Sequence, residues 1–213
     1  MGRGTSVTPD VGNAPSPRRK SELTRQRILV AAATVFRDKG YAHTRIADVA
    51  DEANTHAGAI YYYFASREDL VAQVLAMAIT QLIDAVRSEL AKLPTNSDFR
   101  TKISAAIAAH LLHALTRDVF TAAFTRIHNQ ITPDLHARYA SHLHEYGRLW
   151  DGLMREAQKT GEIRADLDIR VMRLSLMGSM IWSLEWYREG RMTPEDIARQ
   201  MSLTLFEGVA TKG

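Results

Sequence analysis

The segment that decides the fold runs from Thr44 to Phe64 and reads TRIADVADEANTHAGAIYYYF. Apolar residues recur at helical spacing on both sides of Asn54, beginning with Ile46 and Val49. Thr44 is a favourable N-cap for the first of these helices. Asparagine is the non-glycine residue that best tolerates a left-handed backbone. The segment therefore predicts two short helices joined by a tight turn.

The preceding residues predict a longer supporting helix, which makes the layout that of a helix-turn-helix. This helix is expected from Glu22 to about Lys39, with Gly40 placed to end it in a left-handed conformation. In such motifs the second short helix enters the major groove of DNA. Here that helix begins with small residues, and Tyr61 and Tyr62 follow with rings and hydroxyls that suit phosphates and base edges.

The rest of the chain also follows a helical period, and no run alternates with period two for long enough to predict a sheet. Each proline after the N-terminal segment falls at a credible helix boundary. We therefore predict an all-α fold of about nine helices, a head followed by a larger helical domain. The expected helices cover about residues 22–39, 44–53, 57–64, 66–91, 98–115, 118–130, 133–159, 168–187 and 194–209.

Composition excludes several classes of protein. Apolar residues make up 46% and charged residues 24% of the 213, which is typical of a soluble globular chain. The chain has no cysteine, which excludes disulfides, thiolate metal sites and cysteine nucleophiles. Its longest uncharged stretches are 14 residues, whereas a membrane-spanning helix needs roughly 18. With no apolar secretory segment at the N-terminus, a cytoplasmic protein without a membrane partner is expected.

The positive charge is concentrated in the first third of the chain. Residues 1–67 carry a formal charge of +4, whereas residues 68–213 carry −1. Such asymmetry favours a polyanionic partner for the basic part. Residues 1–20 are rich in Gly, Pro, Ser and Thr and end in Arg18, Arg19 and Lys20, so they predict a flexible tail with a basic end.

The N-terminal motifs resemble the TetR family of transcriptional repressors. Residues 24–41 are similar to the family's first helix, residues 44–50 to its second, and residues 58–70 to its recognition helix and the start of helix four. The chain departs from the family at residues 54–56, where Asn-Thr-His replaces the usual Gly-Val-Ser. The resemblance implies three parts: a tail (1–20), a DNA-binding domain (21–67) and a ligand-binding and dimerisation domain (68–213).

The resemblance and the charge together give the expected DNA contacts. Most belong to the recognition helix or to the basic tail, and Arg67 lies at a helix N-terminus where the dipole favours a phosphate. Ile60 and Phe64 are instead expected in the core, with Tyr63 partly packed. The candidates are Arg18, Arg19, Lys20, Thr44, Arg45, His56, Ala57, Gly58, Ala59, Tyr61, Tyr62 and Arg67.

In residues 68–213 the family implies an inducer cavity, usually apolar with a few polar groups. Aromatic and methionine residues at helical spacing are the candidates for lining it, with His113 and His128 as polar anchors. The candidates are His113, Phe120, Phe124, His128, Tyr146, Trp150, Met154 and Met177. Residues 161–168 and 186–188 are similar to regulators of lipid or steroid breakdown, which points to an acyl-type or other apolar effector.

The last two helices combine large apolar residues with small ones that permit close approach. The family implies a homodimer formed by these helices from each subunit, and a two-fold interface is the commonest oligomer solution. The packing of this surface within its own domain is the alternative. The interface candidates are Leu174, Gly178, Ile181, Trp182, Met201 and Leu205.

The combined hypothesis is a dimeric repressor, without cofactor or catalytic activity, that leaves a palindromic operator when a small molecule binds. Three alternatives stay open. One is a metal-responsive repressor that uses histidines such as His110 and His113, which share a helix face. A second is a helical interaction module without sequence-specific DNA binding. The third is a small helical enzyme, although residues 68–213 contain no recognisable catalytic motif.

Overall fold

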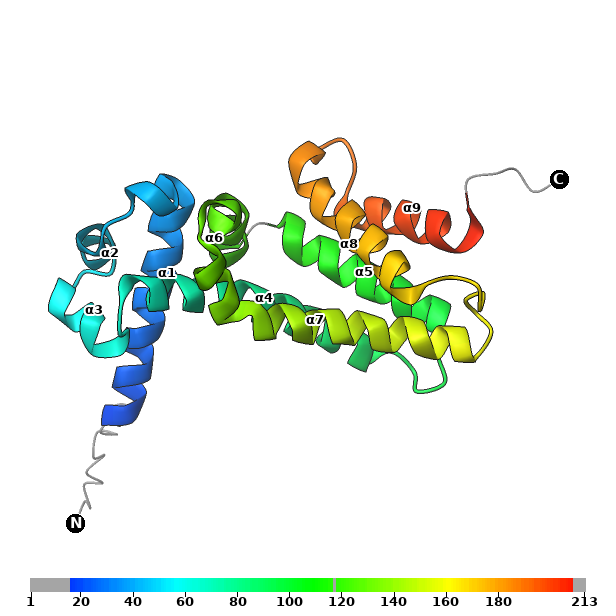
Figure 1. The fold of residues 1–213 in the computed structure, drawn as a ribbon, viewed down its shortest axis with the longest axis horizontal. Helices are drawn as coiled ribbons and strands as arrows, with labels where there is room; N and C mark the ends of the chain where they lie inside the picture. Colours follow the sequence, from blue (N-terminus) through cyan, green and yellow to red (C-terminus); the bar gives the residue numbers. More distant parts are fainter. Residues whose placement is uncertain (1–15, 117, 209–213) are drawn as a thin grey trace, which may run out of the picture.

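The structure, a computed structural model, describes residues 16–116 and 118–208. Within these residues it contains nine α-helices, one 3-10 helix and no strand, which confirms the all-α prediction. Helices α1–α3 form a head at one end, α4 runs from the head into the body, and α6 lies between α1 and the body (Figure 1). The elements are α1 (Pro17–His43), α2 (Ile46–Glu52), α3 (Ala57–Tyr63), α4 (Arg67–Lys92), α5 (Phe99–Leu115), α6 (Val119–Ile127), η1 (His128–Gln130), α7 (Pro133–Lys159), α8 (Ile169–Trp186) and α9 (Pro194–Glu207).

The first helix begins earlier than predicted. The Ser16 hydroxyl accepts a hydrogen bond from the Arg19 amide at 3.4 Å, and Pro17 occupies the first turn. A cap followed by proline is a helix-start signature, so the expectation of a flexible tail is wrong for residues 17–20. Residues 1–15 lie outside the described part of the chain.

Two predicted turn residues adopt the expected positive φ. Asn54, between α2 and α3, has φ 49° and is the only non-glycine residue with positive φ in the described chain. Gly40 has φ 76° and ψ 176°, and the helical backbone of α1 breaks there. That combination of angles belongs to a region that only glycine adopts readily. The chain can therefore turn at Gly40 and enter α2 at the angle that the head requires.

We expect Gly40→Ala to lower the free energy of unfolding by about 1–3 kcal/mol, because alanine is strained at this φ and ψ. Its Cβ would also lie 3.1 Å from Oε1 of Gln130. Gly152→Ala is the matched control, because a Cβ at this helical position of α7 meets nothing within 4 Å. Urea unfolding should show the loss at Gly40 and an unchanged or higher stability at Gly152. Equal stability of the two variants would contradict the role given to Gly40.

The buried side chains form two apolar clusters. The first joins the head to the beginning of α4, to α6 and to the beginning of α7, and includes Phe36, Phe64 and Tyr139. The second lies between α4, α5, α7, α8 and α9, and includes Trp150 and Met154. The first cluster crosses the predicted domain boundary at residue 67. Helix α6 therefore packs with the head, chiefly against α1.

Helix α4 is long and apolar enough, by composition alone, to span a membrane. Half of its most apolar stretch is buried within the protein, where it contributes to both clusters. Its hydropathy is accounted for by its position as the central core helix.

Candidate functional site

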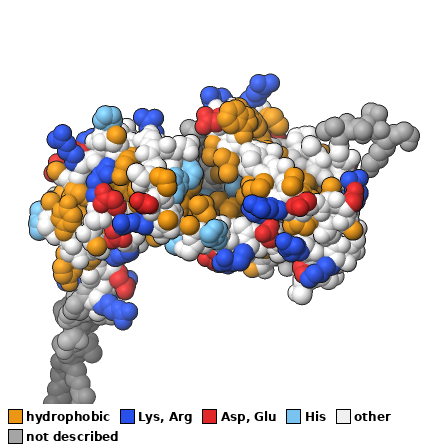
Figure 2. Space-filling model, in the orientation of Figure 1, with side chains coloured by type: hydrophobic (Ala, Val, Ile, Leu, Met, Phe, Trp, Pro, Cys, Tyr) orange, Lys and Arg blue, Asp and Glu red, His pale blue; other side chains and the backbone are white. Residues whose placement is uncertain are grey.

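Helix α3 presents its tyrosines at the outer edge of the head. Tyr62 is 79% and Tyr61 54% exposed, whereas Tyr63 is half-buried and Ile60 is buried. Apolar side chains cover the edge of the head where α3 lies (Figure 2). Tyrosine side chains combine an apolar ring with a polar hydroxyl, which suits them to interfaces. This face of α3 is therefore available for a macromolecule.

The N-terminus of α3 is capped by an imidazole. Nδ1 of His56 accepts a hydrogen bond from the Ala59 amide at 3.2 Å. An accepting Nδ1 carries no proton, so in the neutral ring the proton is on Nε2. The exposed ring can then donate from Nε2 to a phosphate. A Cβ at Gly58 would lie 3.2 Å from Nδ1 of His56, so the small residue at position 58 makes room for the cap.

Contacts from α1 and α4 fix the orientation of α3. The Ser21 hydroxyl hydrogen bonds with that of Tyr63 at 3.5 Å, and Phe64 is buried immediately after the helix. The guanidinium of Arg25 lies 5.2 Å from the centre of the Phe64 ring and donates to the side chain of Gln73 on α4. Helix α3 is thus held on two sides while the side chains of Tyr61 and Tyr62 stay exposed.

Two of the predicted DNA contacts have structural roles instead. Thr44 is buried, and its hydroxyl donates to the carbonyl oxygen of Gly40 at 2.7 Å, so Arg45, not Thr44, is the residue that precedes α2. The guanidinium of Arg67 donates to the carbonyl oxygens of Tyr41 and Thr44 and lies 4.2 Å from the centre of the Tyr41 ring. Both side chains donate hydrogen bonds to backbone carbonyl oxygens where α1 ends and α2 begins. The sequence pattern could not reveal these contacts.

The basic candidates at the start of α1 remain on the surface. Arg18, Arg19 and Lys20 are exposed, and Arg18 forms a 3.5 Å pair with the exposed Glu22. Basic side chains are visible at this end of the molecule, beside the grey segment (Figure 2). Exposed pairs of this kind contribute little stability, so these cations can move to a polyanion at small cost. Arg45, Ala57, Gly58 and Ala59 are on the surface of the head as well, Ala59 partly covered.

The predicted effector ligands do not line one cavity. Phe120 belongs to the first cluster, whereas Tyr146, Trp150, Met154 and Met177 are buried in the second. Phe124 packs against both clusters, and His113 and His128 are half-buried. The prediction of one common lining is therefore wrong for the set as a whole, because α6 turns its apolar face, including Phe120, toward the head.

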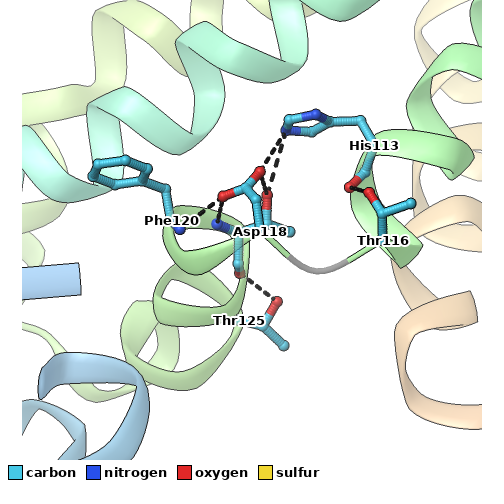
Figure 3. Close-up of polar contacts among 6 residues, drawn as sticks. His113, Thr116, Asp118, Phe120 and Thr125 are labelled. Carbon is cyan, nitrogen blue, oxygen red and sulfur yellow. Dashed lines mark hydrogen bonds and ion pairs between the residues drawn. The ribbon is translucent and has the colours of Figure 1, made fainter. Parts of the chain in front are cut away.

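His113 fastens α6 to α5. Its Nε2 lies 3.2 Å from Oδ2 of Asp118 and 3.4 Å from the Thr121 hydroxyl (Figure 3). Asp118 is the N-cap of α6 and accepts from the Phe120 and Thr121 amides at 2.7 and 3.0 Å. This imidazole is thus part of the connection between α5 and α6.

His128 is similarly engaged. The Tyr139 hydroxyl lies 2.8 Å from Nδ1 of both His128 and His136. One hydroxyl has one proton, so when both rings are neutral one accepts it and the other donates its own Nδ1 proton. Burial, followed by the proximity of His136, lowers the pKa of His128, which favours its neutral form. The cluster holds the end of α6 and η1 against the start of α7.

A third polar cluster lies inside the second core. Nδ1 of His110 lies 2.6 Å from the Tyr146 hydroxyl, and the two rings are stacked. Trp150, one turn along α7, packs edge-on against Tyr146 with ring centres 6.2 Å apart. Burial lowers the pKa of His110 to about 3, with a smaller effect of His113. His110 is not among the predicted effector ligands, although it lies one turn before His113 on α5.

Helix α8 presents an apolar stripe that the described residues leave uncovered. Ile181 and Trp182 are 57% and 66% exposed, and Leu174 and Gly178 lie on the surface nearby. Helix α9 packs chiefly against α5 and only weakly against α8. Between α8 and α9 runs an apolar groove of about 750 Å³, with Met201 and Leu205 in its wall. A contiguous exposed apolar surface of this kind is typical of an interaction surface.

Comparison with known proteins identifies the chain. Residues 28–74 match the family model "Bacterial regulatory proteins, tetR family", and residues 96–209 match "Tetracyclin repressor-like, C-terminal domain". The chain belongs to the TetR family. The two matches together include most of the head and, apart from most of α4, the helices of the body.

Relatives of known role cover most of the chain. The transcriptional repressor KstR2 of Rhodococcus jostii is 25% identical over 88% of this chain and 91% of its own. The fatty acid metabolism regulator protein of Bacillus subtilis is 26% identical over 72% of this chain and 78% of its own. These TetR-family relatives agree with the resemblance to regulators of lipid or steroid breakdown.

Solved structures share the fold. The B. subtilis regulator FadR in complex with stearoyl-CoA has a TM-score of 0.75, 20% identity, and coverage of 87% of this chain and 99% of its own. AibR in complex with isovaleryl coenzyme A and operator DNA has a TM-score of 0.73, 21% identity, and coverage of 86% and 98%. At these identities the likeness concerns the TetR fold alone.

The metal-responsive alternative gains no support from the part of the chain that is described. No group of three or more His, Asp or Glu side chains there could hold a metal ion. His110 and His113 diverge, the first toward Tyr146 and the second toward Asp118. Each has a partner that explains its position within a TetR-family fold.

Proposed function

We propose that this TetR-family protein is a repressor that binds a palindromic operator as a homodimer in the cytoplasm and is released by a small, largely apolar effector. The observation that carries the proposal is α3, which is rigidly supported from behind and presents Tyr61 and Tyr62 outward. Enzymatic activity is not part of the proposal, and the charge surplus of residues 1–67 agrees with a DNA partner.

The head contains residues suited to contact the DNA phosphates and residues suited to contact the bases. Arg18, Arg19, Lys20 and Arg45 are exposed cations suited to phosphates. The small N-terminal residues of α3 permit close approach, and Tyr61 and Tyr62 reach the bases or the thymine methyl groups. His56 donates from Nε2 to a phosphate, as its capping role allows.

Dimerisation would bury the stripe of α8 and fill the groove beside α9. A second copy is the simplest occupant, because a two-fold interface presents the same patch on both subunits. Ile181 and Trp182 would become buried, and Gly178 would permit close approach. Two heads about 34–36 Å apart would then meet successive major grooves on one side of the duplex.

The effector would act through α6, because this helix belongs to the same core as the head. The side-chain oxygen of Gln130 in η1 accepts from the Tyr41 amide at 3.0 Å, which ties η1, directly after α6, to the last turn of α1. FadR and AibR bind acyl-CoA compounds, and the core of this chain between α5, α7 and α8 is largely apolar. We therefore propose an acyl-type or similar apolar effector.

The first experiment compares binding to the DNA upstream of the protein's own gene with binding to a scrambled duplex, at the same moderate salt concentration. Specific affinity should exceed non-specific affinity by a factor of about 10³ or more. If the two duplexes bind equally, a selection from random DNA decides. Enrichment of no sequence would overturn the repressor and leave the non-specific interaction module.

Tyr62→Ala should lower operator affinity by about tenfold to a hundredfold while leaving binding to scrambled DNA nearly unchanged. Tyr62 is highly exposed, so the fold should tolerate the change. Val30→Ala is the control, because Val30 lies on the exposed side of α1 in the same head. A uniform loss on both duplexes would instead assign Tyr62 to the phosphate backbone.

A further inference from the structure

The second core contains a polar cluster that packing alone does not explain. It consists of His110, Tyr146 and Trp150, and Tyr146 and Trp150 belong to the second apolar cluster. Buried polar groups carry a desolvation cost that only hydrogen bonds offset. His110 and Tyr146 satisfy one another at 2.6 Å. The indole of Trp150 is a third polar group at the same place, and it is fully buried.

The Trp150 N–H has no hydrogen-bond partner within the described chain. It lies near enough to the Tyr146 oxygen to oppose, in part, the rise that burial causes in the pKa of Tyr146, without the geometry of a hydrogen bond. Buried donors without a partner are rare in folded proteins, and each calls for an explanation. This donor points to an acceptor that the described residues do not place beside it.

The surroundings of the donor suit a ligand. Met154, Met177 and Met180 from α7 and α8 belong to the same cluster and are buried. Methionine is unbranched and polarizable, so it can repack around an inserted group. An apolar skeleton could therefore enter between α5, α7 and α8 and place one polar atom at Trp150.

We infer that His110, Tyr146 and Trp150 form the polar end of the effector site and select a neutral effector whose oxygen accepts a hydrogen bond from the Trp150 indole. The ligand class is an apolar skeleton that carries a carbonyl or hydroxyl group. This inference rests on the proposed function, and it specifies the polar group of the effector that the site recognises.

A charged group does not suit the cluster. No Lys or Arg is among the buried residues of the described chain, and His110 remains neutral at physiological pH. A carboxylate beside Trp150 would therefore be buried without a counter-ion, which is strongly unfavourable. A thioester or ketone carbonyl, or a hydroxyl, has no such cost.

The test compares three probes of equal chain length: 2-decanone, 1-decanol and decanoate. The ketone and the alcohol should bind with a Kd below about 100 µM, and decanoate at least about tenfold more weakly. The chain has three tryptophans. With indole-labelled protein, the Trp150 N–H proton should move downfield with 2-decanone, whereas the signals of Trp182 and Trp186 stay in place. Spectra of Trp182→Phe and Trp186→Phe assign the signals.

Trp150→Phe should weaken 2-decanone binding by about tenfold, the value of one hydrogen bond, and Trp186→Phe is the matched control at an exposed position. The wild-type spectra keep the test valid if Trp150→Phe fails to fold. Tighter binding of decanoate, an unmoved Trp150 signal, or no binding by any probe would overturn the inference. Operator selectivity is measured on the same samples. Its loss would overturn the proposed function, whereas its presence without ketone binding would overturn only this inference.

Discussion

Ile181→Arg is expected to convert the protein to a monomer and to weaken operator binding by about 10³, to the level of non-specific binding. Ile181 is 57% exposed on α8 and lies in the middle of the stripe that we assign to the two-fold interface. In such an interface each substitution occurs twice. Two guanidinium groups would be brought together in an apolar environment, where unpaired charges are strongly unfavourable.

Sedimentation velocity and operator binding together check this result. A monomer has one head, so it contacts one half-site of the operator and loses the affinity that the second half-site contributes to a dimer. Leu112→Arg is the matched control, because it adds the same charge at an exposed leucine on α5, outside α8 and α9. This variant should remain dimeric. If Ile181→Arg were also dimeric at micromolar concentration, the assignment of α8 to the interface would be wrong.

His110 should make the protein lose stability as the pH falls below 6.5. Its pKa drops from 6.5 in the unfolded chain to about 3 in the fold, chiefly through burial. Between these values the unfolded state binds a proton that the folded state does not, so acid favours unfolding. The slope approaches about 1.4 kcal/mol per pH unit, which is about 2 kcal/mol at pH 5.

Urea unfolding at pH 7, 6 and 5 measures this slope. In His110→Asn the slope should decrease by most of that amount, whereas the exposed His144→Asn should behave as wild type. Burial also lowers the pKa of His128, so a smaller slope should persist. The lowered pKa values of Asp48, Asp98 and Asp196 act only at lower pH, because they start from 3.8. An unchanged slope in His110→Asn would show that His110 is protonated in the folded protein.

Local sequence signals located most elements of the fold. Asn54 and Gly40 marked turns because their φ preferences act within a few residues, and the structure places both at positive φ. Two helix starts were predicted wrongly: α1 begins at Pro17, where a cap–proline signature is present, and Arg45 in place of Thr44 is the N-cap of α2. The exposure of Tyr61 and Tyr62 also followed from helical periodicity, since a helix advances about 100° per residue.

The roles of individual polar residues could not be predicted in this way. Arg67 has the sequence context of a phosphate ligand, yet its guanidinium donates to the turn between α1 and α2, 23 and 26 residues earlier in the chain. His110 pairs with Tyr146, 36 residues away. A long polar side chain can form a hydrogen bond with any acceptor within its reach, and here those acceptors belong to other parts of the fold.

By itself, the sequence determined the all-α fold, the helix-turn-helix and the face of α3 that is free, because caps, turn residues and helical period act over short distances. Only the tertiary structure decided that α6 packs with the head, that Phe120 and Trp150 belong to different cores, and that the Trp150 N–H has no hydrogen-bond partner among the described residues. These properties depend on which helix faces meet, and the packing of whole helices sets that.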